Sequence, residues 1–155
     1  IKMHQPTRCM IVFDGKGGSQ RRRKLFPQYK EKRKVNQRFN RTNDFSSKAD
    51  EQQSNMMQIT RLVRYLDTLP LTTLMIENIE ADDTMAYLAK NVLKSSEVIL
   101  MSTDKDFLQL VNNRISVWSP TKKKLYTPEM VLEEYEIPAH NIDMYRVIDG
   151  DKSCL

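Results

Sequence analysis

The chain has 155 residues, which suits one domain with its own hydrophobic core. No apolar run reaches 18 residues and the first residues carry no signal-peptide core, so neither a membrane span nor secretion is predicted. Two cysteines, Cys9 and Cys154, are too few for a disulfide framework, which indicates a reducing, cytoplasmic setting.

The net charge of +5 is distributed unevenly. Between Lys16 and Arg41 there are 11 Lys/Arg residues and one acid, Glu31, so this segment carries +10 and the rest of the chain −5. A basic segment on an acidic body favours nucleic acid as the partner. A solvated basic loop without a ligand is the alternative that charge alone leaves open.

Short apolar runs alternate with helical patterns along the chain. The runs predict strands at residues 10–13, 74–76, 98–101 and 115–118. Apolar periodicity and capping residues predict helices at residues 49–69, 81–93, 104–111, 127–135 and 141–148. This alternation predicts an α/β fold, a mostly parallel sheet flanked by helices, interrupted by a basic insertion at residues 16–48.

The first two long helices each have one apolar face that we expect to pack on the core. In helix 49–69 this face consists of Met56, Ile59, Leu62, Val63, Leu66 and Leu69. In helix 81–93 it consists of Met85, Leu88, Ala89, Val92 and Leu93.

Acidic side chains follow three of the predicted strands, and one more stands near the C-terminus. They are Asp14, Glu80, Asp82, Asp83, Asp104, Asp106 and Asp151. Ligands of open α/β sheets bind beyond the carboxyl ends of the strands, so a parallel sheet would place these acids on one rim. Clustered carboxylates repel each other without a counterion. Oxygen ligands suit Mg²⁺ or Mn²⁺, and two such ions about 4 Å apart can clamp a phosphodiester.

Each acidic motif also has a purely structural explanation. Asp14, before Gly15, could be a turn residue. The acids from Glu80 to Asp83 could favour the N-terminus of a helix, and Asp104 could cap one. The recurrence of acid after three strands favours the metal-site interpretation.

These motifs resemble those of the 5′-nuclease family. They are the segments 12–17 (VFDGKG), 25–33 (LFPQYKEKR), 79–83 (IEADD), 102–107 (STDKDF) and 150–153 (GDKS). The family includes the 5′-nuclease domain of bacterial DNA polymerase I, phage 5′-exonucleases, phage ribonuclease H and flap endonucleases, and the phage and bacterial branch is the most similar.

The resemblance implies a PIN-like core with a helical arch at residues 16–48, acting as a monomer in the cytoplasm of a bacterial or phage-infected cell. It implies a structure-specific 5′→3′ exonuclease/flap endonuclease that uses two Mg²⁺ or Mn²⁺ ions. Its partners would be DNA with a free 5′ end or 5′ flap, and RNA/DNA primer hybrids.

The resemblance also implies residue roles. The first metal would be bound by Asp14, Glu80, Asp82 and Asp104, and the second by Asp106 and Asp151, with Asp83 beside them. Lys30 and Arg33 would hold the scissile phosphate, and Tyr29 would stack on a terminal base. The remaining basic arch residues are Arg21, Arg22, Arg23 and Lys24.

The chain departs from the family pattern at both ends. Residues 1–9 contain no acid where the family has its first metal-binding Asp, and Cys154 stands where the last Asp is expected. A thiolate is a poor ligand for Mg²⁺. We therefore expect a core that is incomplete at both ends, with weak or no activity, either as part of a longer gene product or with Cys154 beginning an interrupting element such as an intein.

Three other functions stay open at this point. A haloacid-dehalogenase phosphatase would need an acid at position 12, where this chain has Val12. A catalytically impaired nucleic-acid-binding remnant would keep the basic segment and bind without cutting. A single-strand RNA endonuclease of the wider PIN group would prefer unstructured RNA.

Overall fold

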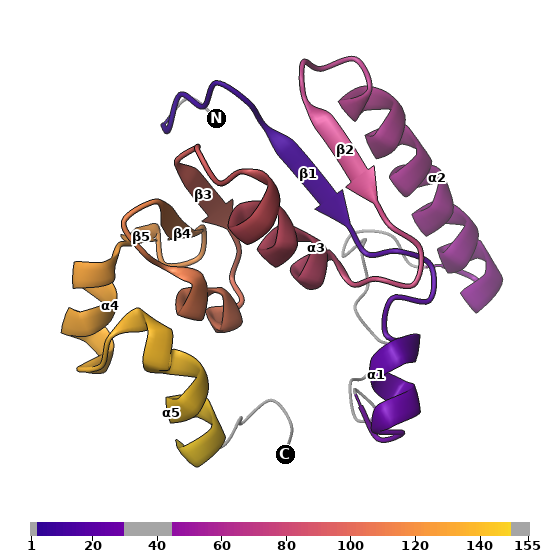
Figure 1. The fold of residues 1–155 in the computed structure, drawn as a ribbon. Coiled ribbons are helices and arrows are strands. Elements are labelled where there is room, and N and C mark those ends of the chain that lie inside the picture. The colour runs from indigo at the N-terminus through magenta and orange to yellow at the C-terminus, as the bar shows by residue number, and fades with distance from the viewer. Residues whose placement is uncertain (1–2, 30–44, 150–155) are drawn as a thin grey trace. The chain divides into compact units, whose positions relative to one another are not determined.

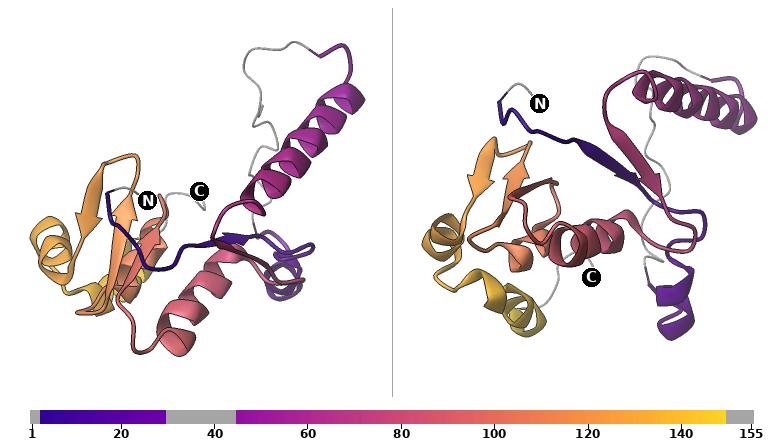
Figure 2. Two further views of the ribbon diagram at one scale, coloured as in Figure 1. Left: turned by 90° about the horizontal axis from the view of Figure 1, so that it is seen from above. Right: turned by 45° about the horizontal axis from the view of Figure 1, so that its top comes forward.

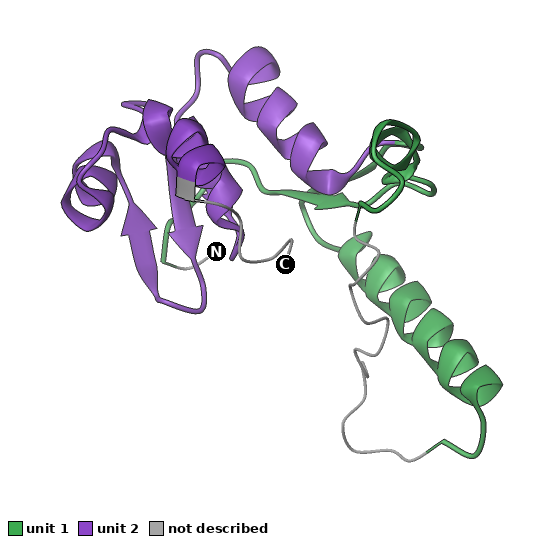
Figure 3. Cartoon of the chain, turned by 90° about the horizontal axis from the view of Figure 1, so that it is seen from below, with its two compact units in different colours: residues 1–78 green, residues 79–155 purple. Residues whose placement is uncertain are grey.

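A computed structural model describes residues 3–29 and 45–149 (Figure 1). The predicted site residues Lys30, Arg33 and Asp151, and also Cys154, lie outside these ranges. The chain divides into two compact units, Ile1–Asn78 and Ile79–Leu155 (Figure 3). The described strands form a two-stranded and a three-stranded sheet, one in each unit, where the sequence analysis expected a single sheet.

The sheet of the first unit consists of two parallel strands. Strand β1 (Met10–Phe13) pairs with β2 (Thr72–Met75), with Met10 opposite Thr72. Between them in sequence come α1 (Gln20–Leu25) and α2 (Lys48–Leu66). Helix α2 begins at a serine cap, because the Ser47 hydroxyl accepts a hydrogen bond from the Asp50 backbone N–H at 3.2 Å.

The apolar face of α2 is largely exposed, which contradicts the prediction that it packs on a core. Met56 is 71 % exposed and Ile59 50 %, and of this helix only Leu66 is buried. The reason is one of length: a 19-residue helix is about 28 Å long. The neighbouring strands have four residues each and extend only about 13 Å. Among the residues that the structure describes, no helix is long and apolar enough to cross a membrane.

The second unit contains the larger sheet. Strand β3 (Val98–Met101) pairs in parallel with β4 (Ile115–Ser119), which pairs in antiparallel fashion with β5 (Lys124–Tyr126) (Figure 2). The helices are α3 (Ala81–Tyr87), the π-helical turn η1 (Leu88–Val92), the 3₁₀ helices η2 (Lys105–Leu110) and η3 (Ala139–Asn141), α4 (Pro128–Tyr135) and α5 (Ile142–Asp149). The sequence analysis missed β5, a three-residue strand that begins with lysine.

The hydrophobic core lies in the second unit. It is a cluster of buried side chains from its sheet and from the helices around it. Strand β4 shows the strict alternation of a half-buried strand, with Ile115, Val117 and Ser119 buried. Helix α4 starts as predicted, because the Thr127 hydroxyl accepts from the Met130 N–H and proline follows at the first helical position.

The helix that follows Glu80 changes pitch before it ends. The Leu93 N–H bonds to the Leu88 carbonyl five residues earlier, at 2.8 Å, so η1 is wider than an α-helix. A wider turn rotates the following residues away from the α-helical register. Ala89, near the start of this turn, is buried as predicted, whereas Val92 at its end, also predicted to face the core, is 56 % exposed.

The guanidinium of Arg114 closes the C-terminal end of this helix. Its Nη2 donates to the Ala89 carbonyl at 2.8 Å, and its Nη1 donates to the carbonyls of Leu93 at 2.7 Å and Ser96 at 3.0 Å. Carbonyl groups at a helix end have no partner within the helix. One side chain next to β4 thus binds carbonyls at the end of the helix and in the loop after it, and ties helix and sheet together.

We predict that Arg114→Ala lowers the free energy of unfolding by about 2–3 kcal/mol, because the carbonyls lose a charged donor. Urea denaturation followed by far-UV circular dichroism would measure the change. Lys94→Ala removes an exposed cation of the same unit and serves as the control. An equal loss of stability in both variants would contradict the assignment.

Candidate functional site

Asp14 directly follows β1, in a turn that is tied to the segment after β2. The Gly18 N–H bonds to the Gly15 carbonyl, and the Asn78 N–H bonds to the Lys16 carbonyl, both at 2.9 Å. Gly17 has φ +77°, and a Cβ built there would lie 2.8 Å from Asn78 Oδ1. Glycine is therefore strongly favoured at position 17, and the turn holds Asp14 at the carboxyl end of β1.

The motif Glu80 to Asp83 forms the start of α3. Asp82 and Asp83 lie in the first helical turn, where they complement the helix dipole as the structural alternative expected. Glu80 precedes the helix and makes no side-chain capping bond to it, and this residue is only 5 % exposed. A carboxylate so thoroughly removed from water must be compensated by a partner, which makes Glu80 the most distinctive acid of the motif.

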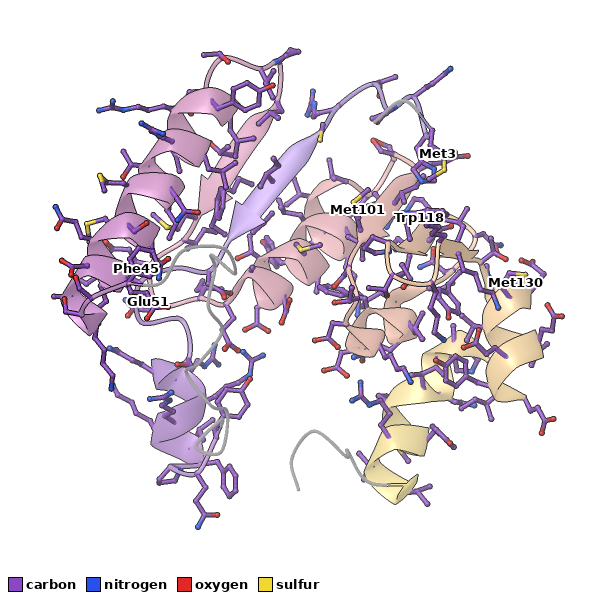
Figure 4. All side chains as sticks on the ribbon, turned by 180° about the vertical axis from the view of Figure 1, so that it is seen from behind. Met3, Phe45, Glu51, Met101, Trp118 and Met130 are labelled. Atoms are coloured by element: carbon purple, nitrogen blue, oxygen red, sulfur yellow. The ribbon has the colours of Figure 1, made fainter. Side chains whose placement is uncertain are left out.

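Asp104 sits on a short connection that leaves the carboxyl end of β3. Met101 at that end lies opposite Trp118 of β4, and Figure 4 labels both side chains. The Ser102 N–H bonds to the Trp118 carbonyl at 3.1 Å. The Asp104 N–H then donates to Ser102 Oγ at 3.1 Å. These hydrogen bonds fix the backbone of the acidic loop to the end of the sheet.

The Asp104 carboxylate caps η2, so the capping alternative is confirmed. Its Oδ1 accepts from the Asp106 N–H at 2.9 Å. Within the described part of the chain Oδ2 accepts no hydrogen bond, so that oxygen remains available to another ligand. Capping and ligand binding are therefore compatible in the same side chain.

Asp106 forms an ion pair with Arg146 of α5, a contact that sequence reasoning missed. Asp106 is on η2 and Arg146 is 40 residues further along the chain. No local sequence pattern predicts an ion pair between residues so far apart in the chain.

A cavity of about 160 Å³ adjoins Asp104. The loop after β3 contributes Ser102, Thr103 and Lys105, and the end of β4 and the loop after it contribute Ser119 and Thr121. Because β3 and β4 are parallel, both loops leave the same edge of the sheet. The sequence analysis did not identify the hydroxyl groups of Ser119 and Thr121, because the segment 119–124 reads only as a turn between strands.

One wall of the cavity is fixed by Glu134 of α4. Its two carboxylate oxygens bind Lys122 Nζ and Lys124 Nζ, both at 2.8 Å, and the Tyr126 hydroxyl donates to them at 3.1 Å. The Lys122 ammonium first, and then that of Lys124, lowers the pKa of Glu134 from 4.5 to about 2. The Glu134 carboxylate in turn raises the pKa of Lys122.

The basic residues of α1 form an exposed surface with aromatic neighbours. Arg21, Arg23 and Lys24 are exposed, and Phe26 just beyond the helix is 57 % exposed. The guanidinium of Arg22 lies 5.8 Å from the centre of the Tyr29 ring, so two residues predicted to bind nucleic acid are brought together. Cationic and aromatic groups side by side are the surface that single strands require.

The predicted metal ligands fit a hard divalent cation by their chemistry, since all are carboxylates. Within residues 3–29 and 45–149, however, no three His, Cys, Asp or Glu side chains lie close enough to hold an ion together. Asp14 belongs to the first unit, Glu80, Asp82, Asp104 and Asp106 belong to the second, and Asp151 is outside the described residues.

Residues 1–136 match the family model described as the 5′-3′ exonuclease N-terminal resolvase-like domain. The chain belongs to this family. The resemblance to 5′-nucleases found in the sequence is thereby confirmed, and the match gives no support to a haloacid-dehalogenase phosphatase.

Two curated relatives illustrate the match. A 5′-3′ exonuclease of Aquifex aeolicus is 29 % identical over 153 residues, covering 98 % of this chain and 47 % of the relative. The flap endonuclease Xni of Psychromonas ingrahamii is 27 % identical over 154 residues, covering 99 % and 53 %. The chain spans about half the length of these relatives.

A solved structure has the same fold. A bacteriophage T5 flap endonuclease, crystallised as a pseudo-enzyme–product complex with DNA and metal ions, superposes with a TM-score of 0.76 at 22 % identity. The match covers 97 % of this chain and 54 % of the phage protein. The α/β fold with parallel strands and flanking helices is therefore confirmed as predicted.

We predict that Glu134→Gln lowers stability most above about pH 5 and progressively less as the pH falls from about 4.5 to about 2. The sign follows from the lowered pKa of Glu134: its stabilisation is complete above the ordinary pKa and is lost as the folded carboxylate becomes protonated. Urea midpoints of the wild type and the variant at several pH values would measure this. Glu133→Gln, in the same helix, is the control, and a pH-independent difference for Glu134→Gln would contradict the prediction.

Proposed function

We propose that this chain is the nuclease core of a structure-specific 5′→3′ exonuclease/flap endonuclease that hydrolyses phosphodiesters of DNA and of RNA primers. The observation that supports it is the family match over residues 1–136 together with the placement of Asp14 and Asp104 directly beyond the carboxyl ends of β1 and β3. A parallel α/β fold binds its ligands at those strand ends.

The proposed cofactor is a pair of Mg²⁺ or Mn²⁺ ions. When bound, such ions lower the pKa of a water molecule and offset charge on the phosphate. The proposed ligands are Asp14, Glu80, Asp82 and Asp104 for the first ion, and Asp106 and Asp151 for the second, with Asp83 nearby. The chain's own contribution is to hold carboxylates ready: the Ser102 and Asp106 backbone bonds fix the Asp104 loop before any ion arrives.

The proposed substrate is DNA with a free 5′ end or 5′ flap. In this proposal Arg21, Arg22, Arg23 and Lys24 attract the phosphate backbone, and Tyr29 stacks on a base. The exposure of this basic helix and the Arg22–Tyr29 contact support the assignment. Lys30 and Arg33 would hold the scissile phosphate, a role that rests on their place in the family motif.

A second candidate is a binding remnant that holds such DNA without cutting it. It is favoured by the finding that no three acids converge within the described ranges, and by Cys154 in place of an acid. Such a protein would bind flap DNA equally with Mg²⁺ or with EDTA.

We predict that Asp104→Asn lowers cleavage of a fluorescent 5′-flap DNA in Mg²⁺ or Mn²⁺ by at least about 100-fold, since even residues that only support a ligand cost 10- to 100-fold. Asparagine preserves the cap of η2, so the fold is kept. Glu97→Gln is the matched control, an exposed acid at the opposite end of β3. Binding without cleavage by the wild type would instead establish the remnant.

We also predict that replacing Arg21, Arg23 and Lys24 with glutamine weakens flap binding and makes it less sensitive to salt. Losing three phosphate contacts should reduce the slope of log Kd against log salt by about 2 for a single strand. Fluorescence anisotropy in EDTA would measure binding separately from cleavage. The matched control replaces Lys90, Lys94 and Lys123, exposed cations of the second unit, and should leave the slope unchanged.

A further inference from the structure

The ion pair between Asp106 and Arg146 joins two elements whose backbones are already fixed. Helix α5 packs against η2. Phe107 and Leu108 anchor η2 in the core, and Ile142 does the same for α5. Because both elements are anchored in the core, we expect the pair to open by a change of side-chain rotamer.

The two side chains are partly open to water, which allows such a change. The Arg146 side chain is 25 % exposed and that of Asp106 is 58 % exposed. An arginine keeps its charge at any relevant pH, so it neutralises the carboxylate wherever it stays in contact. A carboxylate that a guanidinium has neutralised attracts a divalent cation less strongly than a free one.

We propose that Arg146 is a positioning residue that serves as an internal counter-cation: it holds Asp106 while no metal is bound and competes with the divalent cation for that carboxylate. This inference rests on the proposed function, in which Asp106 is a ligand of the second ion. It adds that the affinity of this ion is set by a residue outside the acidic motifs.

The competition should change the metal affinity by a small, measurable factor. Partly exposed ion pairs are weak, so displacement of Arg146 reduces the affinity of the Asp106-dependent metal site by about two- to fivefold. Its benefit is that the acidic loop stays neutralised without metal, where repulsion among neighbouring carboxylates would otherwise disturb it. A purely structural ion pair would change thermal stability and leave metal affinity unaltered.

The test is a Mn²⁺ titration of the 155-residue chain, in which electron paramagnetic resonance measures the free ion. Asp106→Asn identifies the site that depends on this carboxylate. We expect Arg146→Gln to tighten that site about two- to fivefold. Arg146→Lys, which keeps the charge, should remain between the wild type and Arg146→Gln. Circular dichroism in EDTA checks that each variant is folded, and if Arg146→Gln is not, the lysine variant alone must show tightening.

Lys105→Gln is the matched control, because it removes one positive charge adjacent to Asp106 in the sequence, and among the described residues Lys105 has no ion-pair partner. Equal tightening in Lys105→Gln and Arg146→Gln, or unchanged or weaker binding in Arg146→Gln, overturns the inference. Mn²⁺ binding that Asp106→Asn leaves intact also overturns it, whereas the nuclease proposal is decided separately by flap cleavage and Asp104→Asn.

Discussion

The parallel pairing of β3 and β4 determines where the polar loops of the second unit lie. Because the strands run in the same direction, the loop that carries Asp104 and the hydroxyl-rich loop after Ser119 leave the same edge. The buried side chains of Leu100 and Val117 hold this pair of strands on the core. A slip of one residue would turn those side chains outward and carry the acidic loop away from its neighbours. Hydrophobic packing thus places the polar loops, and Leu108, Val117 and Tyr126 of the core also line the cavity beside them.

Features that depend on neighbouring residues were predictable from the sequence. The apolar runs at Met10, Val98 and Ile115 became strands, since a short run bounded by turn residues has few other solutions. The caps at Thr127 and Asp104 could be recognised because each side chain bonds to a backbone N–H two or three residues on. The acidic motifs were found in the same way, as local patterns that resemble those of the family to which the chain belongs.

Features that depend on distant partners were not predictable. Arg114 satisfies carbonyls 18 to 25 residues away, and Arg146 meets an acid 40 residues away, yet both look like ordinary surface cations in the sequence. The helical pattern of α2 correctly gave a helix, but periodicity cannot tell how much surface is available to cover it. Val92 was misplaced because a single wider turn changes the register of everything after it. Bringing acids from different strands together in one site would likewise be a long-range property that local patterns cannot supply.

The uneven distribution of buried side chains affects how easily each unit opens locally through thermal motion. Among the described residues, Leu66 is the only buried apolar side chain of the first unit, while the second contains the whole core cluster. We therefore expect amide hydrogens of β1 and α2 to exchange with solvent through small openings, and those of β3 and β4 only through larger ones. Helix α1 belongs to the first unit, which we expect to open more easily, and Asp104 belongs to the second unit, which contains the core. Under the proposed function, an adaptable basic surface would suit substrates of varied shape, and a rigid support would suit carboxylates that bind a cation.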